Sequence, residues 1–227
     1  MNKRFRIRNS GICSLRALNE NDVVWRRADA IHIAHFHPRS SGHHPETEVR
    51  MLYNNRGIYL LYRVKDRFVR SVHTEYNAKV HEDSCVECFL QPPDAPGYYN
   101  FEVNAGGTLH VNYIIDPHRD ENGKRKDMRP VPAELAATLQ IRSSLPRVIE
   151  PEIREKLNWS LSLYIPLDFF ACHSPLPALP GSRWRANFYK CGDKTSHPHW
   201  GSWQALDILN FHQPESFGIL EFDGQQT

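Results

Sequence analysis

The sequence lacks long hydrophobic runs, a strong excess of one charge and a paired set of cysteines. No run reaches the roughly 18 apolar residues that a membrane-spanning helix requires, so we expect no membrane partner. Lysine and arginine total 28 against 26 aspartate and glutamate residues, so nothing indicates a nucleic-acid or anionic-membrane surface. Five cysteines at irregular spacing favour a reduced, intracellular protein. No apolar segment follows the basic first residues, so we expect a cytoplasmic protein, or an extracytoplasmic one if a leader was removed.

The motifs of several common enzyme and metal-binding classes are also missing. The chain has no glycine-rich phosphate loop, no Gly-x-Ser-x-Gly and no His-Glu-x-x-His. Cys85 and Cys88 match Cys-x-x-Cys, but residues three apart on a strand point to opposite faces and cannot both bind one metal ion. The histidines at 32–37, and His197 with His199, would bind a metal only if several converged, so surface or hydrogen-bonded roles are the simpler interpretation.

Short strand-like runs separated by turns are abundant. Residues 49–53 and 58–64 are two such runs, joined by the Asn-Asn-Arg-Gly turn at 54–57. Residues 159–165 alternate apolar and polar side chains, which is typical of a half-buried strand. We count about nine strands, little helix and no internal repeat. The sequence therefore predicts an all-β fold, an antiparallel β-sandwich of immunoglobulin-like or jelly-roll type, with residues 1–227 as one domain.

Other segments have a weaker strand pattern. Residues 1–48 are expected to be irregular and to run over the sheet edges. Residues 116–129 are dense in charge, and we expect a solvated, mobile loop there. A short helix is predicted at 166–170, because proline is tolerated at a first helical position. Residues 133–139 fit either a helical turn or the start of a strand.

Two acidic residues stand near the middle of neighbouring predicted strands within residues 83–104. The turn at 92–97 separates two apolar runs, which predicts an antiparallel pair. One run carries Glu87 and the other Glu102, and strand alternation puts Asn104 on the same side as Glu102. A mid-strand acid is costly unless it faces a partner or water. A polar, concave sheet face is therefore predicted as a binding surface.

These acids allow two functions that belong to different classes. Glu87 and Glu102 could be the carboxylate pair of a glycoside hydrolase. They could equally bind sugar hydroxyls or calcium without chemistry, and we favour binding because no other enzyme motif is present. Trp200 and Phe211 precede the last predicted strand, and exposed aromatic rings stack on the apolar faces of sugars. The alternative is that aromatics of this segment, Trp203 among them, only close one end of the sandwich.

The order and spacing of these pieces resemble the family 9 carbohydrate-binding modules, within the larger DOMON-like group of β-sandwiches that bind sugars or haem. The resemblance covers nearly the whole chain. The segments that carry it are Trp25 with Ala28, residues 49–62, residues 83–89, residues 101–104, residues 159–166, the strand that contains Asn187, and residues 203–218. It implies non-catalytic binding of a glycan or small saccharide, associated with polysaccharide catabolism.

The resemblance also implies roles for particular residues. Modules of this family hold a sugar between two tryptophans, above polar groups on the sheet. Glu87 matches the hydroxyl-binding glutamate of the family, and Phe211 stands where the second tryptophan is expected. His81 or a neighbour occupies the first tryptophan position, and Glu102 stands where an arginine is expected. Two acids would therefore share the floor of the site.

Asn187 and Tyr189 lie on a later strand, where the resemblance implies a polar amide that projects from the sheet. The ligand-binding residues predicted from pattern and resemblance together are His81, Glu87, Glu102, Asn104, Asn187, Tyr189, Trp200 and Phe211. A saccharide is the expected partner and no cofactor is required. Calcium is a candidate ion, because paired acids can coordinate it.

A haem-binding DOMON-like domain is the least favoured function. Such a domain would ligate the iron with a histidine and a methionine. The chain offers only Met1, Met51 and Met128, and Met51 lies in a predicted core strand.

Overall fold

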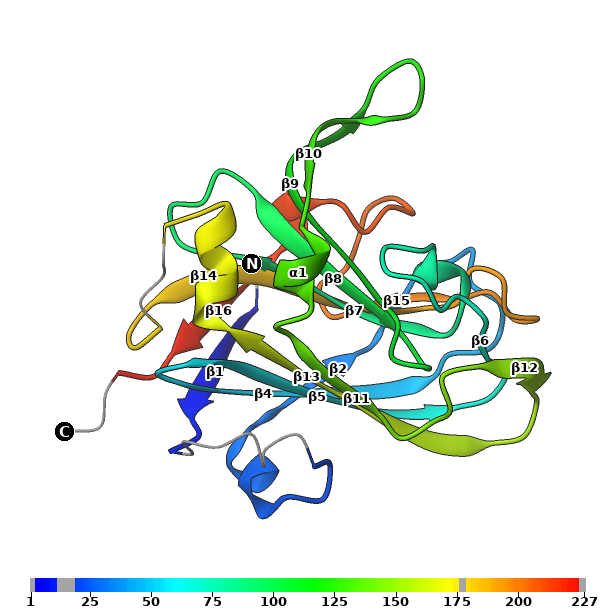
Figure 1. Cartoon of the computed structure of the whole chain (residues 1–227). Helices are drawn as coiled ribbons and strands as arrows, with labels where there is room; N and C mark the ends of the chain where they lie inside the picture. The colour runs from blue at the N-terminus through cyan, green and yellow to red at the C-terminus, as the bar shows by residue number, and fades with distance from the viewer. Residues whose placement is uncertain (1–2, 12–18, 176–178, 225–227) are drawn as a thin grey trace.

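The computed structural model describes residues 3–11, 19–175 and 179–224. Two layers of β-strands pack face to face, and the helical segments are short (Figure 1). The first layer contains, in spatial order, β10 (Arg125–Pro130), β9 (Leu109–Arg119), β8 (Tyr98–Asn104), β7 (Cys85–Gln91), β14 (Arg183–Cys191) and β16 (Gly218–Phe222). The second contains β4 (Glu46–Asn54), β5 (Gly57–Asp66), β13 (Leu157–Pro166) and β11 (Gln140–Ser143).

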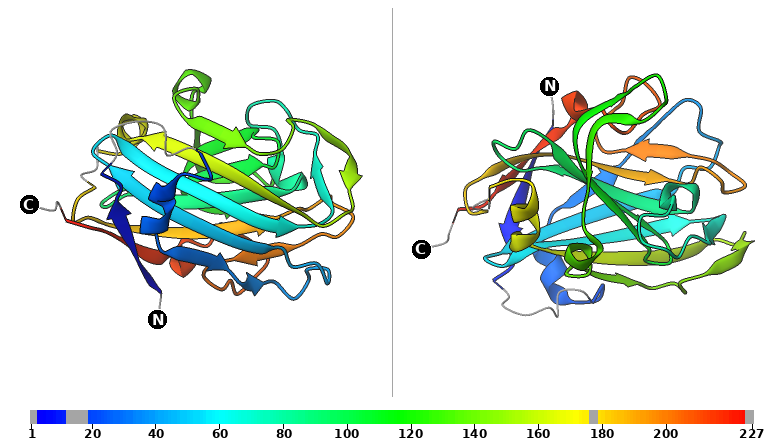
Figure 2. Two further views of the ribbon diagram at one scale, coloured as in Figure 1. Left: turned by 90° about the horizontal axis from the view of Figure 1, so that it is seen from below. Right: turned by 45° about the horizontal axis from the view of Figure 1, so that its top comes forward.

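One strand near the N-terminus, β1 (Arg4–Asn9), joins the two layers (Figure 2). Its first part pairs in parallel with β16 and its last two residues pair in parallel with β4. Ile7 enters the core, whereas Arg6 points outward and forms an ion pair with Asp223. The prediction that residues 1–48 are irregular is therefore wrong here, because the basic side chains alternate with apolar ones that the core buries.

The remaining elements are short. The additional strands are β2 (Ala30–Ile33) on β4, β15 (Trp200–Ser202) on β14, β3 (His35–Phe36) on β15, and β6 (Val69–Ser71) paired with β12 (Ile149–Ile153). The helical segments are α1 (Ala133–Ala136) and the 3-10 turns Val23–Arg27, Val80–Glu82, Leu167–Cys172 and Pro214–Ser216. The short helix predicted at 166–170 is confirmed as a 3-10 turn. Of the two alternatives for residues 133–139, the structure shows the helical turn, which is α1.

The charged segment 116–129 is a β-hairpin and not the loop expected from its composition. β9 continues to Arg119, and β10 pairs with it in antiparallel fashion. The turn contains Asn122 and Gly123, and Gly123 has a φ of 77°, a left-handed conformation that glycine adopts without strain. The hairpin projects beyond the first layer, at the top of Figure 1. It is therefore an ordered extension of the sheet.

The core lies between the layers and sorts the side chains of β7 by face. Val86, Cys88 and Leu90 belong to the main apolar core, whereas Cys85 and Glu87 point to the outer side of the first layer. This alternation confirms that the two thiols of the Cys-x-x-Cys match point in opposite directions. The predicted acids therefore stand on the face that the core does not occupy.

The predicted all-β sandwich is confirmed, and sixteen strands appear in the described ranges where about nine were expected. The two pairings of β1 are the parallel exceptions in a sheet that is otherwise antiparallel over these ranges. None of the helices that the structure describes is long and apolar enough to cross a membrane.

Candidate functional site

Strand register brings a row of polar side chains together on the outer face of the first layer. Glu87 on β7 is directly opposite Glu102 on β8, as the paired-strand prediction requires. On the two flanking strands, Glu102 is opposite His110 and Glu87 is opposite Tyr189. Residues directly opposite one another in antiparallel strands share a face, so four adjacent strands contribute to one row.

A cavity of about 870 Å³ lies over this row. Its floor consists of Glu87, Asn100, Glu102, His110, Asn112 and Cys191. One wall follows the 3-10 turn at Val80–Glu82 and the loops around β15, with His81, Asp193, Trp200, Leu209, Asn210, Phe211 and His212. The other wall is the projecting hairpin, with Arg119, Gly123, Lys124, Arg125 and Met128. The cavity thus combines a polar floor with aromatic and basic walls.

Two aromatic side chains form the wall nearest β14. The ring of Phe211 stacks on that of Tyr189, with centroids 4.2 Å apart and planes 12° apart. The Tyr189 hydroxyl donates to the carbonyl oxygen of Phe211 at 2.9 Å, which fixes the loop on the strand. Trp200 is half-buried, and its Nε1 donates to Asp193 Oδ1 at 2.7 Å. Phe211 and Trp200 are therefore held in place while part of each ring stays accessible.

Glu102 is the ionised acid of the floor. Burial alone would raise the pKa of its carboxyl, but His81, helped by the neighbouring histidines, lowers the pKa to about 2. His81 Nδ1 lies 3.7 Å from Glu102 Oε2, and this interaction raises the pKa of His81. Asn100 Nδ2 also donates to Glu102 Oε1 at 2.7 Å. The floor therefore presents a fixed carboxylate, a strong hydrogen-bond acceptor.

Glu87 has the opposite electrostatic character. Complete burial raises the pKa of its carboxyl well above the ordinary value, and the negative charge of Glu102 raises it further. The Cys191 thiol donates to Glu87 Oε1 at 3.2 Å. Burial and the charge of Glu102 thus favour the protonated form of Glu87, whereas the histidines favour the carboxylate form of Glu102. One group can donate a hydrogen bond and the other can only accept.

His110 and Asn112 complete the polar floor through a chain of hydrogen bonds. His110 Nδ1 lies 3.1 Å from the carbonyl oxygen of Asn77 and 3.2 Å from that of Ala78, so this nitrogen is the donor. Its Nε2 then accepts from Asn112 Nδ2 at 2.9 Å. These contacts hold the imidazole and the amide at the cavity edge in defined orientations.

The structure brings five of the eight predicted site residues to the cavity: His81, Glu87, Glu102, Trp200 and Phe211. The others are placed beneath or beside it and do not line it. Tyr189 is fully buried under Phe211 and supports that ring.

Asn104 and Asn187 were predicted to bind the ligand, but both are structural residues. Hydrogen bonds within the protein occupy their side-chain amides. Asn104 Nδ2 donates to Asp83 Oδ2 at 2.9 Å, and its Oδ1 accepts from the Thr108 backbone. Asn187 Oδ1 accepts from the Gln204 backbone at 2.9 Å. Both side chains are completely buried, and they hold a turn and a loop in place.

Sequence reasoning missed several lining residues. The register of β9 on β8 brings His110 and Asn112 to the cavity. The residue pattern of β9 alone does not determine that register. The hairpin residues Arg119 and Arg125 were assigned to a loop, although the Asn-Gly pair at its turn is a recognised hairpin signal. His212 lies beside Tyr98, with its Nδ1 2.8 Å from the tyrosine hydroxyl, and nothing local in the sequence indicated that contact.

A group of metal-type donors lies at one end of the floor. Atoms of Cys85, Glu87 and Cys191 lie within 4.8 Å of one another. Two thiols suit zinc or copper(I), whereas calcium prefers an all-oxygen set, so this group differs from the pair of acids for which calcium is a candidate. Of the methionines considered for haem, Met51 is buried in the core, Met128 stands on the hairpin and Met1 lies outside the described residues.

A second hollow, of about 970 Å³, lies elsewhere, between Lys65, Phe68 and Lys156. Two of its charged residues, Lys65 and Asp66, are engaged within the protein. Lys65 Nζ lies 2.9 Å from Glu46 Oε1, and the carboxylate of Asp66 is bound by buried partners. The first cavity, with its ionised acid, protonated acid and accessible aromatic rings, is therefore the candidate functional site.

Fold and site together define a β-sandwich with one polar, aromatic-walled cavity on the outer face of a sheet. Residues 16–222 match carbohydrate-binding family 9. The chain belongs to this family, since the match covers most of its length.

The chain is also similar to known proteins in sequence and in structure. A candidate carbohydrate-binding protein from Bacteroides uniformis has a crystal structure that superimposes with a TM-score of 0.84 at 30% identity, over 98% of this chain and 100% of that chain. A family 9 module from Caldicellulosiruptor kristjanssonii in complex with cellotriose gives a TM-score of 0.66 at 14% identity, over 99% and 95% of the two chains. An "Extracellular protein" from Arthroderma benhamiae is 23% identical over 188 residues, which are 78% of this chain and 79% of that protein.

Proposed function

We propose that this protein binds saccharides in the cavity over β7 and β8 and does not cleave them. The observation that carries the proposal is the pairing of a fixed carboxylate, Glu102, with the accessible aromatic rings of Phe211 and Trp200 in one cavity. A sugar has hydroxyl groups at its edge and apolar C–H faces, so it needs both kinds of contact at once. Membership of carbohydrate-binding family 9 supports the same function.

Some polar groups of the cavity would accept hydrogen bonds from the ligand, and others would donate hydrogen bonds to it. Glu102 accepts from sugar hydroxyls, because its carboxylate is ionised and held by Asn100. Glu87, which keeps its proton, and His81 can donate. The ring of the sugar would then lie against Phe211, which Tyr189 supports from behind. Each group is positioned before the ligand arrives, which lowers the cost of binding.

Relatives support the saccharide as the ligand. The Caldicellulosiruptor kristjanssonii module has been solved in complex with cellotriose and also with glucose. The Bacteroides uniformis protein is described as carbohydrate-binding at 30% identity to this chain. We further propose that this protein holds glycan fragments during polysaccharide catabolism, as the sequence resemblance suggests.

Replacing Phe211 with alanine is expected to weaken saccharide binding about tenfold, because the stacking surface is lost. Calorimetric titration of glucose, galactose, xylose, cellobiose and glucuronate against both proteins would measure the effect. Ile208→Ala is the matched control, since Ile208 lies in the same loop but is 60% exposed and outside the cavity lining.

Absence of binding to every sugar at millimolar concentration, or equal loss in the two variants, would contradict the proposal. The same sugars as aryl glycosides test the hydrolase alternative. We expect no release of the aryl group, whereas turnover that Glu87→Gln abolishes would establish catalysis instead.

A further inference from the structure

The projecting hairpin carries two arginines that face each other, and neither forms an ion pair with a described residue. Arg125 on β10 is directly opposite Arg119 on β9, so their charges share one face of the hairpin. Like charges directly opposite on neighbouring strands repel each other. In the described part of the chain, neither guanidinium forms an ion pair: Arg119 donates to the Gly123 carbonyl and Arg125 to that of Pro117.

The three aspartates of the hairpin are engaged elsewhere. Asp116 Oδ1 lies 2.6 Å from His118 Nδ1, and Asp127 Oδ1 lies 3.7 Å from Arg129 Nε. Asp120 Oδ1 accepts from the backbone at the turn. The hairpin therefore does not neutralise its arginine pair with these aspartates, although they are close in sequence.

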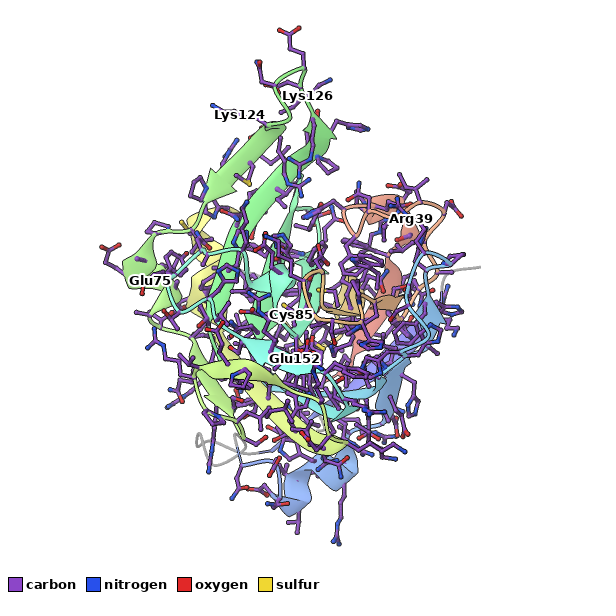
Figure 3. All side chains as sticks on the ribbon, turned by 90° about the vertical axis from the view of Figure 1, so that its right-hand side faces the viewer. Arg39, Glu75, Cys85, Lys124, Lys126 and Glu152 are labelled. Carbon is purple, nitrogen blue, oxygen red and sulfur yellow. The ribbon has the colours of Figure 1, made fainter. Side chains whose placement is uncertain are left out.

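The two arginines line the cavity as well as contacting bulk solvent. Arg119, Lys124 and Arg125 all line the wall opposite Phe211. Arg125 is partly buried, and both burial and the positive charge of Arg119 lower its pKa. Figure 3 shows Lys124 on this hairpin, above the body of the molecule in which Cys85 lies. Positive charge thus accumulates at the mouth of a cavity whose floor presents the Glu102 carboxylate.

We propose that the preferred ligand is an acidic saccharide, a sugar that carries a carboxylate as a uronic acid does. Its carboxylate binds Arg119 and Arg125 at the mouth, and its hydroxyl groups bind Glu102 at the floor. A guanidinium matches a carboxylate with two parallel hydrogen bonds, so a facing pair of arginines is suited to this planar anion. This inference rests on the proposed function, since it assigns a ligand class to the same cavity.

The inference predicts that glucuronate binds about ten- to a hundredfold more tightly than glucose, as charge-assisted hydrogen bonds allow. Titrations of both sugars at low and high salt would measure the preference, which should shrink as salt screens the arginines. In the double variant Arg119→Gln, Arg125→Gln, the ratio of glucuronate affinity to glucose affinity should fall to about one. Lys126→Gln is the matched control, since Lys126 is on the same hairpin but not in the cavity lining.

The outcomes separate this inference from the proposed function. If glucose binds as tightly as glucuronate, or the preference survives in the double variant, the inference is overturned and saccharide binding stands. If neither sugar binds, the proposed function fails and the inference fails with it. Thermal unfolding of each variant would check that the fold is kept. We expect unchanged unfolding temperatures, because the arginine pair lies on the projecting hairpin and not in the core.

Discussion

Replacing Lys190 with methionine is expected to destabilise the fold by about 3–5 kcal/mol, because it leaves a carboxylate buried without its partner. The Lys190 and Asp66 side chains are both fully buried, with Nζ 3.4 Å from Asp66 Oδ2. Nζ also lies 2.8 Å from His199 Nε2, and Trp159 Nε1 donates to Asp66 Oδ2 at 3.0 Å. Urea unfolding at neutral pH would measure the loss.

The double variant Lys190→Met, Asp66→Asn is the control, and it should recover part of the stability because no buried charge remains. A loss below about 1 kcal/mol in the single variant, as for an exposed ion pair, would contradict the account. Burial alone would raise the pKa of Asp66, but Lys190 and His43 hold it well below its ordinary value. The stabilisation from this carboxylate is therefore present above about pH 4 and lost as the pH falls through the folded pKa.

Replacing Glu102 with glutamine is expected to weaken saccharide binding about 10- to 100-fold, because a neutral amide replaces the charged acceptor. The substitution keeps the size of the side chain and removes the ionised group that His81 and Asn100 hold in place. Calorimetric titration with glucose and glucuronate would measure the change.

Glu87→Gln is the matched control for this variant. Glu87 stands directly opposite Glu102 but keeps its proton, so the same substitution leaves its charge unchanged. We expect binding close to that of the original protein. An equal loss of saccharide affinity in the two variants would show that Glu102 is not the ionised member of the pair.

Much of the site's framework could be predicted from strand alternation. Two apolar runs around a proline-rich turn predicted the pairing of β7 and β8, and alternation placed Glu87 and Glu102 on the outer face. The strict period of two leaves little freedom once strands and turn are recognised. The sandwich and the two acids were therefore predictable from local pattern.

Contacts made by distant segments could not be predicted in this way. Alternation put Asn104 on the same face as Glu102, but Asp83 and the backbone at His73 occupy its amide. Asn187 is likewise covered by the chain at Gln204. Which polar side chain stays open to a ligand depends on where loops cross the sheet, and their path is set by tertiary packing.

The hairpin is an intermediate case. Asn122 and Gly123 are a local signal for a tight turn between strands, but the surrounding charges favoured a loop. That Arg119 and Arg125 would face the cavity depends on the register of β10 on β9, including its shifts after Arg125. Composition alone could not reveal this orientation.

The most direct test of saccharide binding in this cavity is the indole N–H signal of Trp200 in a nitrogen-15 NMR titration. Trp200 Nε1 donates to Asp193 at the cavity wall, whereas the Trp184 indole is buried in the core and donates to Ser182. Adding glucose or glucuronate should shift the Trp200 signal in a saturable way and leave that of Trp184 in place, with Trp200→Phe identifying the signal. A Trp200 signal that stays unchanged while calorimetry reports binding would place the sugar elsewhere and contradict the account.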